Sequence, residues 1–416
     1  MSDFQLHRLG MLMEPEPGNP HEVEGVLNPA AARGPDGNLY IFPRLVARGN
    51  YSRIGIARVR FNQAGDPSGV ERMGIALEPE ADYEKRPNGG GGCEDPRITF
   101  VEPLRRYVMT YTAFSSRGPR IAAASSKDLF HWQRLGLVPF APYRGIDLSN
   151  VDDKDACLFP TAIPNPSGEP ELAMLHRPLF PGTRPEETAC APASRDLDIG
   201  RESIWISYRP ISMEAFQPSL RIQFSHHRLA TPVSPWERLK IGCGTPPILT
   251  RHGWLIVYHG VSEIETLNEN PGKDPPTDGH QLCYSAGVMV LSKEHPQVIR
   301  YRSTKPVLTP TLPEECHGAV AHVVFPTVLT GATTSAYPTA STFTTGWPIV
   351  GSELRVLTYP IHCRQAVWPI RRKQRPNADF NILWERSGRL SLVALWISFG
   401  TREADRQERT GSLIDN

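Results

Sequence analysis

The chain has 416 residues, and its 45 Lys and Arg residues almost balance its 44 Asp and Glu residues. A net charge of +1 gives no electrostatic attraction to nucleic acid or to an anionic membrane surface. No apolar run approaches the roughly 18 residues of a membrane-spanning helix. We therefore expect a small-molecule partner, no nucleic acid and no membrane.

Cysteine usage and the start of the chain predict a cellular compartment. There are seven cysteines, an odd number, and none is arranged as C-x-x-C. The first residues are polar and lack the apolar core of a secretory signal. Both features favour a reducing, cytoplasmic location. The sequence leaves open whether the chain forms a homo-oligomer.

Short strands joined by turns are predicted along most of the chain, because 41 prolines and 34 glycines interrupt any helical period. Residues 1–25 are expected to be a polar lead-in. Apolar strand patterns then follow at 39–42, 54–59, 107–111, 120–124, 172–176, 204–207, 254–259 and 286–290, and a further unit begins at 323–326.

These strand patterns group into five similar units that recur every roughly 65 to 80 residues, which predicts an all-β, five-bladed β-propeller over residues 26–330. In that fold the innermost strand of every blade starts near one axis. The strand starts that would converge there are Asn28, Asp95, Asp155, Pro246 and Pro326. An irregular β-sandwich with accidental repetition is the alternative.

The run from Gly89 to Arg97 combines four glycines with two carboxylates and a guanidinium. Pro96 fixes its own φ and restricts Asp95, so this carboxylate is expected to be held in place beside pliable backbone. Loops on rigid sheets commonly carry chemistry. The alternative is a turn in which Asp95 caps backbone N–H groups and Arg97 pairs with Glu94.

Six motifs in chain order resemble glycoside hydrolase family 130, which contains β-mannoside phosphorylases and some β-mannosidases on a five-bladed propeller. The motifs are Gly92-Cys93-Glu94-Asp95-Pro96-Arg97, Asp153-Lys154-Asp155-Ala156-Cys157-Leu158-Phe159-Pro160, His176-Arg177-Pro178, Gly244-Thr245-Pro246-Pro247-Ile248, Trp254–Gly260 and Val324-Phe325-Pro326-Thr327. The resemblance spans residues 28 to 327 and implies an inverting phosphorolysis of β-mannosides to α-mannose 1-phosphate.

The residue types suit that reaction, because phosphate is already an anion and needs no general base. A phosphorylase therefore needs one carboxylic acid and a group of cations. By resemblance, Asp95 is the catalytic acid and protonates the leaving oxygen through the mannose 3-hydroxyl. The candidate phosphate ligands are Lys154, Arg177, Tyr258, His259 and, more weakly, Arg120. The candidates for binding mannose or bracing the acid are Arg44, Glu94, Arg97 and Asp155.

No metal or organic cofactor is expected, with inorganic phosphate as co-substrate. His226-His227 lacks the spaced partners of a zinc site, and no phosphate-binding glycine motif or nucleophile elbow is present. Two other functions stay open. A hydrolase of the same family would use a further carboxylate, for which Glu202, Glu237 and Glu263 are equal candidates. A non-catalytic sugar-binding propeller is the other.

The resemblance stops after Thr327, and the last blade is predicted to be incomplete or disrupted. The codons of the run that starts at Phe343 can be read one nucleotide earlier. With allowed third bases, they then encode Val-Tyr-Tyr-Gly-Met-Ala-Asp-Ser-Arg-Ile-Gly-Val-Ala-Arg-Leu, which resembles the fifth blade of the family. We therefore hypothesise a frameshift, in the gene or in its sequencing, between about Thr327 and Ser341, which would make residues 331–416 a segment of doubtful order. A divergent but genuine tail is the alternative.

Overall fold

The computed structural model describes residues 5–87, 89–143, 146–180, 202–216, 226–264, 282–316, 321–327, 329–331, 353–363 and 388–397. Strands form most of this part of the chain, as expected of an all-β protein. None of its helices has the length and apolar character needed to cross a membrane. The segment 332–352, which contains most of the run 343–356 with the predicted frameshift signature, lies outside the described residues.

The first two units are four-stranded and antiparallel, with each strand pairing with the next along the chain. The first contains β2(Gly25–Arg33), β3(Leu39–Ala47), β4(Tyr51–Phe61) and β5(Pro67–Leu77). The second contains β6(Gly91–Val101), β7(Arg106–Ser115), β8(Gly118–Ser126) and β9(Gln133–Leu137). A short parallel contact between β4 and β6 joins the two units into one eight-stranded sheet.

The third and fourth units repeat this antiparallel order, each with one additional short strand. The third contains β10(Asp152–Leu158), β11(Ile163–Pro164), β12(Pro170–Leu179), β13(Ile204–Arg209) and β14(His226–Ala230). The fourth contains β15(Lys240–Cys243), β16(Ile248–Thr250), β17(Gly253–Glu263), β18(Leu282–Leu291) and β19(Ile299–Arg302). The short helical turns are η1(Asp82–Glu84), η2(Glu102–Leu104), η3(Leu148–Asn150), η4(Met213–Phe216), η5(Pro235–Glu237) and α2(Pro313–Cys316).

A further four-stranded sheet combines the beginning of the chain with its end. Its strands are β1(Gln5–Met11), β20(Leu329–Gly331), β21(Glu353–Cys363) and β22(Gly388–Ile397), in the order β1-β21-β22-β20. Part of the expected lead-in is therefore a strand. Leu12 and Met13, directly after β1, are only 5% and 4% exposed and pack with Val323.

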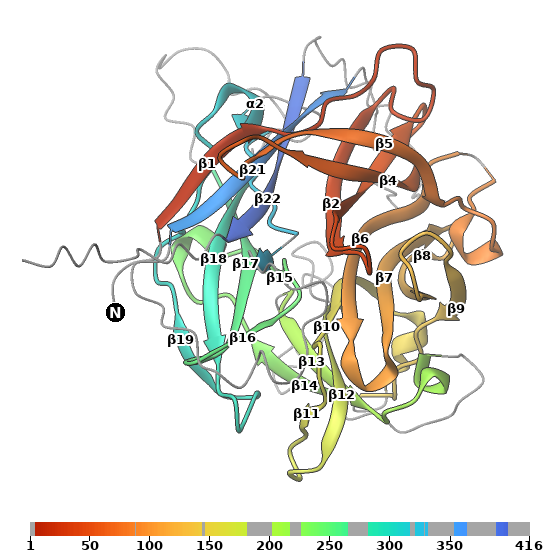
Figure 1. Cartoon of the computed structure of the whole chain (residues 1–416). Coiled ribbons are helices and arrows are strands. Elements are labelled where there is room, and N and C mark those ends of the chain that lie inside the picture. Colours follow the sequence, from red (N-terminus) through yellow and green to blue (C-terminus); the bar gives the residue numbers. More distant parts are fainter. Residues whose placement is uncertain are drawn as a thin grey trace, which may run out of the picture.

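Apolar side chains between neighbouring sheets form the core. Val108 and Ala123 of the second unit pack with Leu158 and Met174 of the third, and all four are at most 1% exposed. Such burial on both faces of a sheet favours Val, Ile, Leu and small residues along the strands. Figure 1 shows the sheets following one another around the molecule in chain order, with β2, β6, β10 and β15 toward its middle.

A buried glutamate recurs at the helical turn before the inner strand of several units. Each of these glutamates is 0% exposed, accepts two backbone N–H bonds and forms an ion pair with an arginine of an outer strand. The pairs are Glu84–Arg134, Glu237–Arg302 and Glu315–Arg8. Arg134 lies on β9 and Arg302 lies on β19, and each of these strands is the last of its unit. The equivalent pair of Arg8 with Glu315 therefore indicates that β1 is the outer strand of the last unit.

Candidate active site

The inner strands of the first three units share a bulge that places a polar residue in the left-handed backbone region. Asn28, Asp95 and Asp155 have φ values of +44°, +49° and +58°. At each position the pairing with the next strand shifts register, because two residues lie opposite one. Asn and Asp are the non-glycine residues that tolerate this geometry best. The same backbone irregularity therefore presents all three side chains.

Asp95 is fixed through one of its two carboxylate oxygens. Asn28 donates from Nδ2 to Oδ1 of Asp95 at 2.5 Å, and Nη1 of Arg44 donates to the same oxygen at 3.2 Å. The Asp95 side chain is 10% exposed. No side chain of the described residues hydrogen-bonds to its Oδ2. That oxygen is available to a ligand.

Arg44 also determines the position of Glu94, the neighbour of Asp95. Its Nη2 donates to Oε1 of Glu94 at 2.8 Å, and its Nε donates to Oγ of Ser52 at 2.8 Å. Both carboxylates therefore contact one guanidinium, in which several hydrogen bonds fix the orientation. Glu94 and Arg44 brace the Asp95 carboxylate.

The charge state of Asp95 follows from competition between burial and nearby cations. Burial is the largest single effect and would raise the pKa of Asp95, but the lowering effects, led by Arg44 and Lys154, together more than offset it, and the pKa lies below the ordinary value. The Asn28 hydrogen bond acts in the same direction. In the protein without substrate, this carboxyl group is therefore ionised at neutral pH.

Arg97 ties the second unit to the fourth. Its Nε donates to the carbonyl oxygen of Gly244 at 2.5 Å, and Nη1 donates to the carbonyl oxygens of Asp95 and Pro96. The residue is 1% exposed. The expected alternative, a turn in which Arg97 pairs with Glu94, is not what the structure shows. Arg97 stabilises the backbone beneath Asp95.

A second carboxylate, Asp155, lies among basic groups from other strands. Nε of Arg177 donates to Oδ2 of Asp155 at 2.6 Å, and Nε2 of His259 lies 3.6 Å from the same oxygen. Burial lowers the pKa of His259 to about 3, so this imidazole is neutral. Burial is the largest single effect on Asp155 and would raise its pKa, but the surrounding basic groups, Arg177 foremost, together bring the pKa below its ordinary value.

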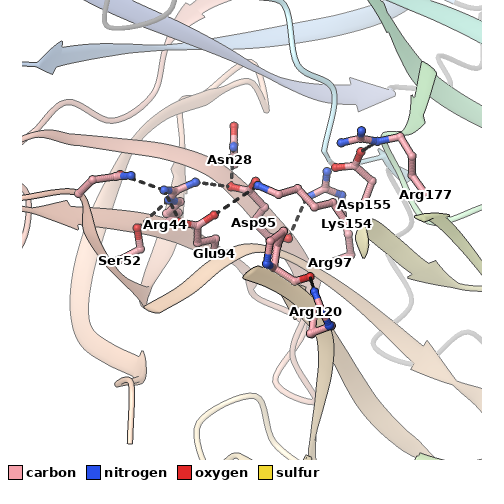
Figure 2. Close-up of polar contacts among 12 residues, drawn as sticks. Asn28, Arg44, Ser52, Glu94, Asp95, Arg97, Arg120, Lys154, Asp155 and Arg177 are labelled. Atoms are coloured by element: carbon pink, nitrogen blue, oxygen red, sulfur yellow. Dashed lines mark hydrogen bonds and ion pairs between the residues drawn. The ribbon is translucent and has the colours of Figure 1, made fainter. Parts of the chain in front are cut away.

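Lys154 lies between these two carboxylate sites. Its Nζ is 3.8 Å from Oε2 of Glu94 and 5.5 Å from the centre of the Phe114 ring. Figure 2 shows its ammonium group reaching toward Glu94 and Asp95, with the Asp155–Arg177 pair beyond it. Asp95 therefore faces Lys154, and the basic groups continue past it to Arg177.

Tyr258 and Arg120, two of the expected phosphate ligands, do not join this group. Tyr258 is 0% exposed, and its hydroxyl donates to Oε2 of Glu237 at 2.8 Å on the core side of β17. Arg120 donates to Oδ1 of Asp152 at 2.5 Å and to the carbonyl oxygens of Ser149 and Asn150. Both side chains are engaged by structural partners.

A hollow adjoins the glycine-rich run, and Phe114 lies close to it. The hollow has a volume of 530 Å³, within the roughly 300–1,000 Å³ range of ligand pockets. Arg86, which lines the hollow, stacks 4.9 Å from the centre of the Phe114 ring. The other described residues that line it are Tyr51, Asp82, Lys85, Pro87, Gly89 and Ser116. Because Lys154 contacts the same ring, the hollow lies one aromatic side chain away from the basic groups.

Two residues near the site were not singled out as site residues by the sequence. Gly242 on β15 leaves room for its neighbours, since an added Cβ would come within 3.0 Å of both Asp155 and His259. Glu202 forms an ion pair with Nη1 of Arg177. Of the three glutamates considered for a hydrolase, it alone contacts a residue of this basic group: Glu237 binds Tyr258 and Arg302 in the core, and Glu263 pairs with Arg238.

The sequence profile of glycoside hydrolase family 130, described as beta-1,4-mannooligosaccharide phosphorylase, matches residues 7–191 and 207–335. The chain belongs to this family. The resemblance inferred from the six motifs is thereby confirmed. The matched region ends eight residues before Phe343, where the re-read run begins.

Individual relatives of this family 130 member agree with the profile. A 1,2-beta-oligomannan phosphorylase of Thermoanaerobacter sp. is 27% identical over 321 residues, which are 76% of this chain and 85% of that protein. Matches to three other mannoside phosphorylases cover only 50–59% of those proteins.

Two solved structures show the same fold. A beta-1,2-mannobiose phosphorylase from Listeria innocua, in complex with beta-1,2-mannobiose, has a TM-score of 0.52 at 22% identity, covering 76% of this chain and 86% of that one. A structure from work on family 130 glycoside hydrolases that target beta-1,2 mannosidic linkages in Candida mannan has a TM-score of 0.51 at 18% identity, covering 85% and 90%.

Proposed function

We propose that this chain is a β-mannoside phosphorylase on a five-bladed β-propeller. The repeated antiparallel units and the outer-strand position of β1 support the propeller. The names of the relatives support the reaction. The observation that carries the proposal is the position of Asp95, a carboxylate with one free oxygen that faces Lys154 and the basic groups beyond it.

In the proposed reaction, phosphate attacks the anomeric carbon of a β-mannoside from the face opposite the leaving sugar. The bond from that carbon to the leaving oxygen breaks, and a bond to a phosphate oxygen forms with inversion, giving α-mannose 1-phosphate. Asp95 supplies the proton that the leaving oxygen gains, through the mannose 3-hydroxyl. Lys154, Arg177 and the neutral His259 hold the phosphate.

Substrate binding would bring Asp95 into its acid form. A bound phosphate offsets the positive charge of Lys154 and Arg177, and a bound sugar excludes water from the Asp95 carboxyl group. Both effects disfavour the carboxylate and raise its pKa. Lys154, one of the cations that lower the pKa of Asp95, is thus also one of those whose charge phosphate would offset.

The proposal needs no metal or organic cofactor, and it places phosphate as the co-substrate. The hollow beside Phe114 is where we place the sugar units on the leaving side of the bond. We further propose that the protein acts in the cytoplasm, where inorganic phosphate is abundant, on small oligosaccharides.

The test is to incubate the protein with β-1,4-mannobiose and with β-1,2-mannobiose, each with and without inorganic phosphate. We expect turnover only with phosphate, and mannose 1-phosphate of the α configuration as product. The linkage that is cleaved identifies the preferred substrate. Equal release of free mannose without phosphate would contradict the proposal.

A β-mannosidase of the same family is the second candidate function. The contact of Glu202 with Arg177 favours it, since that carboxylate lies where a water-activating base would be needed. Turnover that does not depend on phosphate would support this candidate. Binding of mannobiose without any turnover would instead support a sugar-binding propeller without catalytic activity.

A further inference from the structure

Glu202 lies directly against a cation that the proposed reaction needs. Oε2 of Glu202 forms an ion pair with Nη1 of Arg177, and its side chain is 17% exposed. Its backbone is anchored beside β15, because the Ile241 N–H donates to the Glu202 carbonyl oxygen at 3.1 Å. The position of Glu202 relative to Arg177 is therefore fixed at the backbone, while the side chain reaches into the site.

The two carboxylates that contact Arg177 are held very differently. Asp155 is 2% exposed at its side chain, lies on the bulge of β10 and contacts both Arg177 and His259. In the part of the chain that the structure describes, the Glu202 side chain has a single polar partner, Arg177. Glu202 also has one more rotatable bond than Asp155. Glu202 is thus the carboxylate that is free to leave Arg177.

The balance of charge around the site gives that carboxylate a role. The basic side chains of this region are Arg44, Arg97, Lys154, Arg177 and Lys240, and its carboxylates are Glu94, Asp95, Asp155 and Glu202. Among the residues that the structure describes, five cations thus face four anions. An incoming phosphate would add negative charge to a nearly balanced site unless one carboxylate withdrew.

On the basis of the proposed function, we propose that Glu202 is a displaceable anion that occupies the phosphate position on Arg177 in the empty enzyme and sets the affinity for phosphate. A carboxylate and a phosphate offer a guanidinium the same pair of oxygen acceptors, so they compete for one edge of it. The apparent phosphate affinity is then the intrinsic affinity multiplied by the fraction of molecules in which Glu202 has left Arg177.

Displacement also separates this role from that of a base. A glutamate that activates water must stay beside the anomeric carbon during the reaction, whereas a displaceable anion leaves when phosphate arrives. Removing its charge therefore has opposite effects in the two cases. It strengthens phosphate binding if Glu202 is displaced, and it abolishes turnover with water if Glu202 is a base.

The test compares Glu202→Gln with the wild type. The amide keeps the size of the side chain and the backbone contacts, but it does not compete as an anion. We expect the dissociation constant of inorganic phosphate, measured by isothermal titration calorimetry, to fall roughly tenfold. The KM for phosphate in mannobiose phosphorolysis should fall in parallel.

Glu263→Gln is the matched control, because Glu263 pairs with the exposed Arg238 and not with Arg177. Phosphate binding by this variant should equal that of the wild type. A dissociation constant that is unchanged or higher in Glu202→Gln overturns the inference, as does the absence of phosphate binding in both proteins. Loss of phosphate-independent turnover in Glu202→Gln would make Glu202 a base and would equally overturn it.

Failure of the proposed function is visible separately. If the wild type turns mannobiose over only with phosphate but Glu202→Gln binds phosphate no more tightly, the inference is wrong and the function stands. If the wild type shows no phosphate-dependent turnover, the function is wrong, and the calorimetric titration still decides whether Glu202 competes with an anion at Arg177.

Discussion

Asn28 donates a hydrogen bond of 2.5 Å to Oδ1 of Asp95, although the two residues are 67 positions apart and belong to different four-stranded units. Both lie on bulges in the left-handed backbone region. The side chain of one unit thus orients the proposed acid of the next. Because Oδ1 is occupied, Oδ2 is the oxygen that would carry the transferred proton.

Replacing Asp95 by Asn should remove the proton donor while keeping the contact with Asn28 sterically possible. We expect the rate of mannobiose phosphorolysis to fall by about 10²- to 10⁴-fold, the usual contribution of a general acid. The circular dichroism spectrum should not change. Asp66→Asn, directly after the exposed residues 62–65, is the control and should keep full activity. Near-normal rates for Asp95→Asn would exclude Asp95 from this role.

Gly242 should be needed for the geometry of the second carboxylate. In Gly242→Ala, the added Cβ would come within 3.0 Å of both Asp155 and His259, so both side chains must move. We expect kcat/KM for phosphate to fall by about 100-fold, as small misplacements of site groups commonly cause. Gly69→Ala is the control, because no atom lies within 4 Å of its added Cβ. Equal activity of the two variants would show that Asp155 and His259 tolerate displacement.

Much of this site could be predicted because its residues lie in recognisable motifs on inner strands. Strand alternation explains why Tyr258, one of the expected phosphate ligands, does not reach the site. Adjacent residues on a regular strand point to opposite faces, and β17 pairs regularly through Tyr258 and His259, so only His259 reaches Asp155. At the bulge of β10, by contrast, Lys154 and Asp155 both contact site residues.

Contacts between distant segments could not be predicted from the sequence. The bond from Arg97 to the Gly244 carbonyl spans 147 positions and depends on how two units pack. Gly242 is important because an added side chain would collide with Asp155 and His259, and no local sequence pattern encodes that proximity. The sequence did not distinguish Glu202 from Glu237 and Glu263 as a candidate hydrolase carboxylate; only their partners in the structure do. Likewise, only the pairing of β1 shows that part of residues 1–25 is a strand.

His259 should make the stability of the protein depend on pH. Burial lowers its pKa to about 3 in the folded protein, whereas an unfolded chain has a value near 6.5. The unfolded state therefore binds the proton first, and stability that is fully present above about pH 6.5 is lost as the pH falls toward the folded value. Between about pH 7 and pH 5 this one histidine should cost about 2 kcal/mol of unfolding free energy.

Urea unfolding of His259→Gln and the wild type at these two pH values measures that contribution. The loss of stability on acidification should be about 2 kcal/mol smaller in the variant. His226, whose pKa burial lowers to about 2, acts in the same direction in both proteins and cancels from the difference. His131→Gln is the control, because its side chain is 90% exposed. Identical acid losses in all three proteins would contradict a buried, neutral His259.

The last unit gives a reason to test the reading frame of the gene. Outer strands β5, β9, β14 and β19 pair antiparallel with the strand before them, whereas β1 pairs parallel with β21. The contact of Arg8 with Glu315 nevertheless gives β1 the ion pair of an outer strand. Strand β1 thus has the ion pair of an outer strand, but its pairing with β21 differs from that of the other outer strands. This combination fits a fifth unit whose middle strands are read out of frame.

We therefore expect the encoding DNA to contain a single-nucleotide shift between about Thr327 and Ser341. Restoring the frame would supply the run Tyr-Tyr-Gly-Met-Ala-Asp. The restored chain should unfold at a higher temperature than the present one, because its last unit would complete the proposed propeller. It should also have the higher activity on mannobiose. DNA sequencing and mass spectrometry of the native protein decide the frame. One uninterrupted frame, with peptides that match residues 343–356 as printed, would refute the shift.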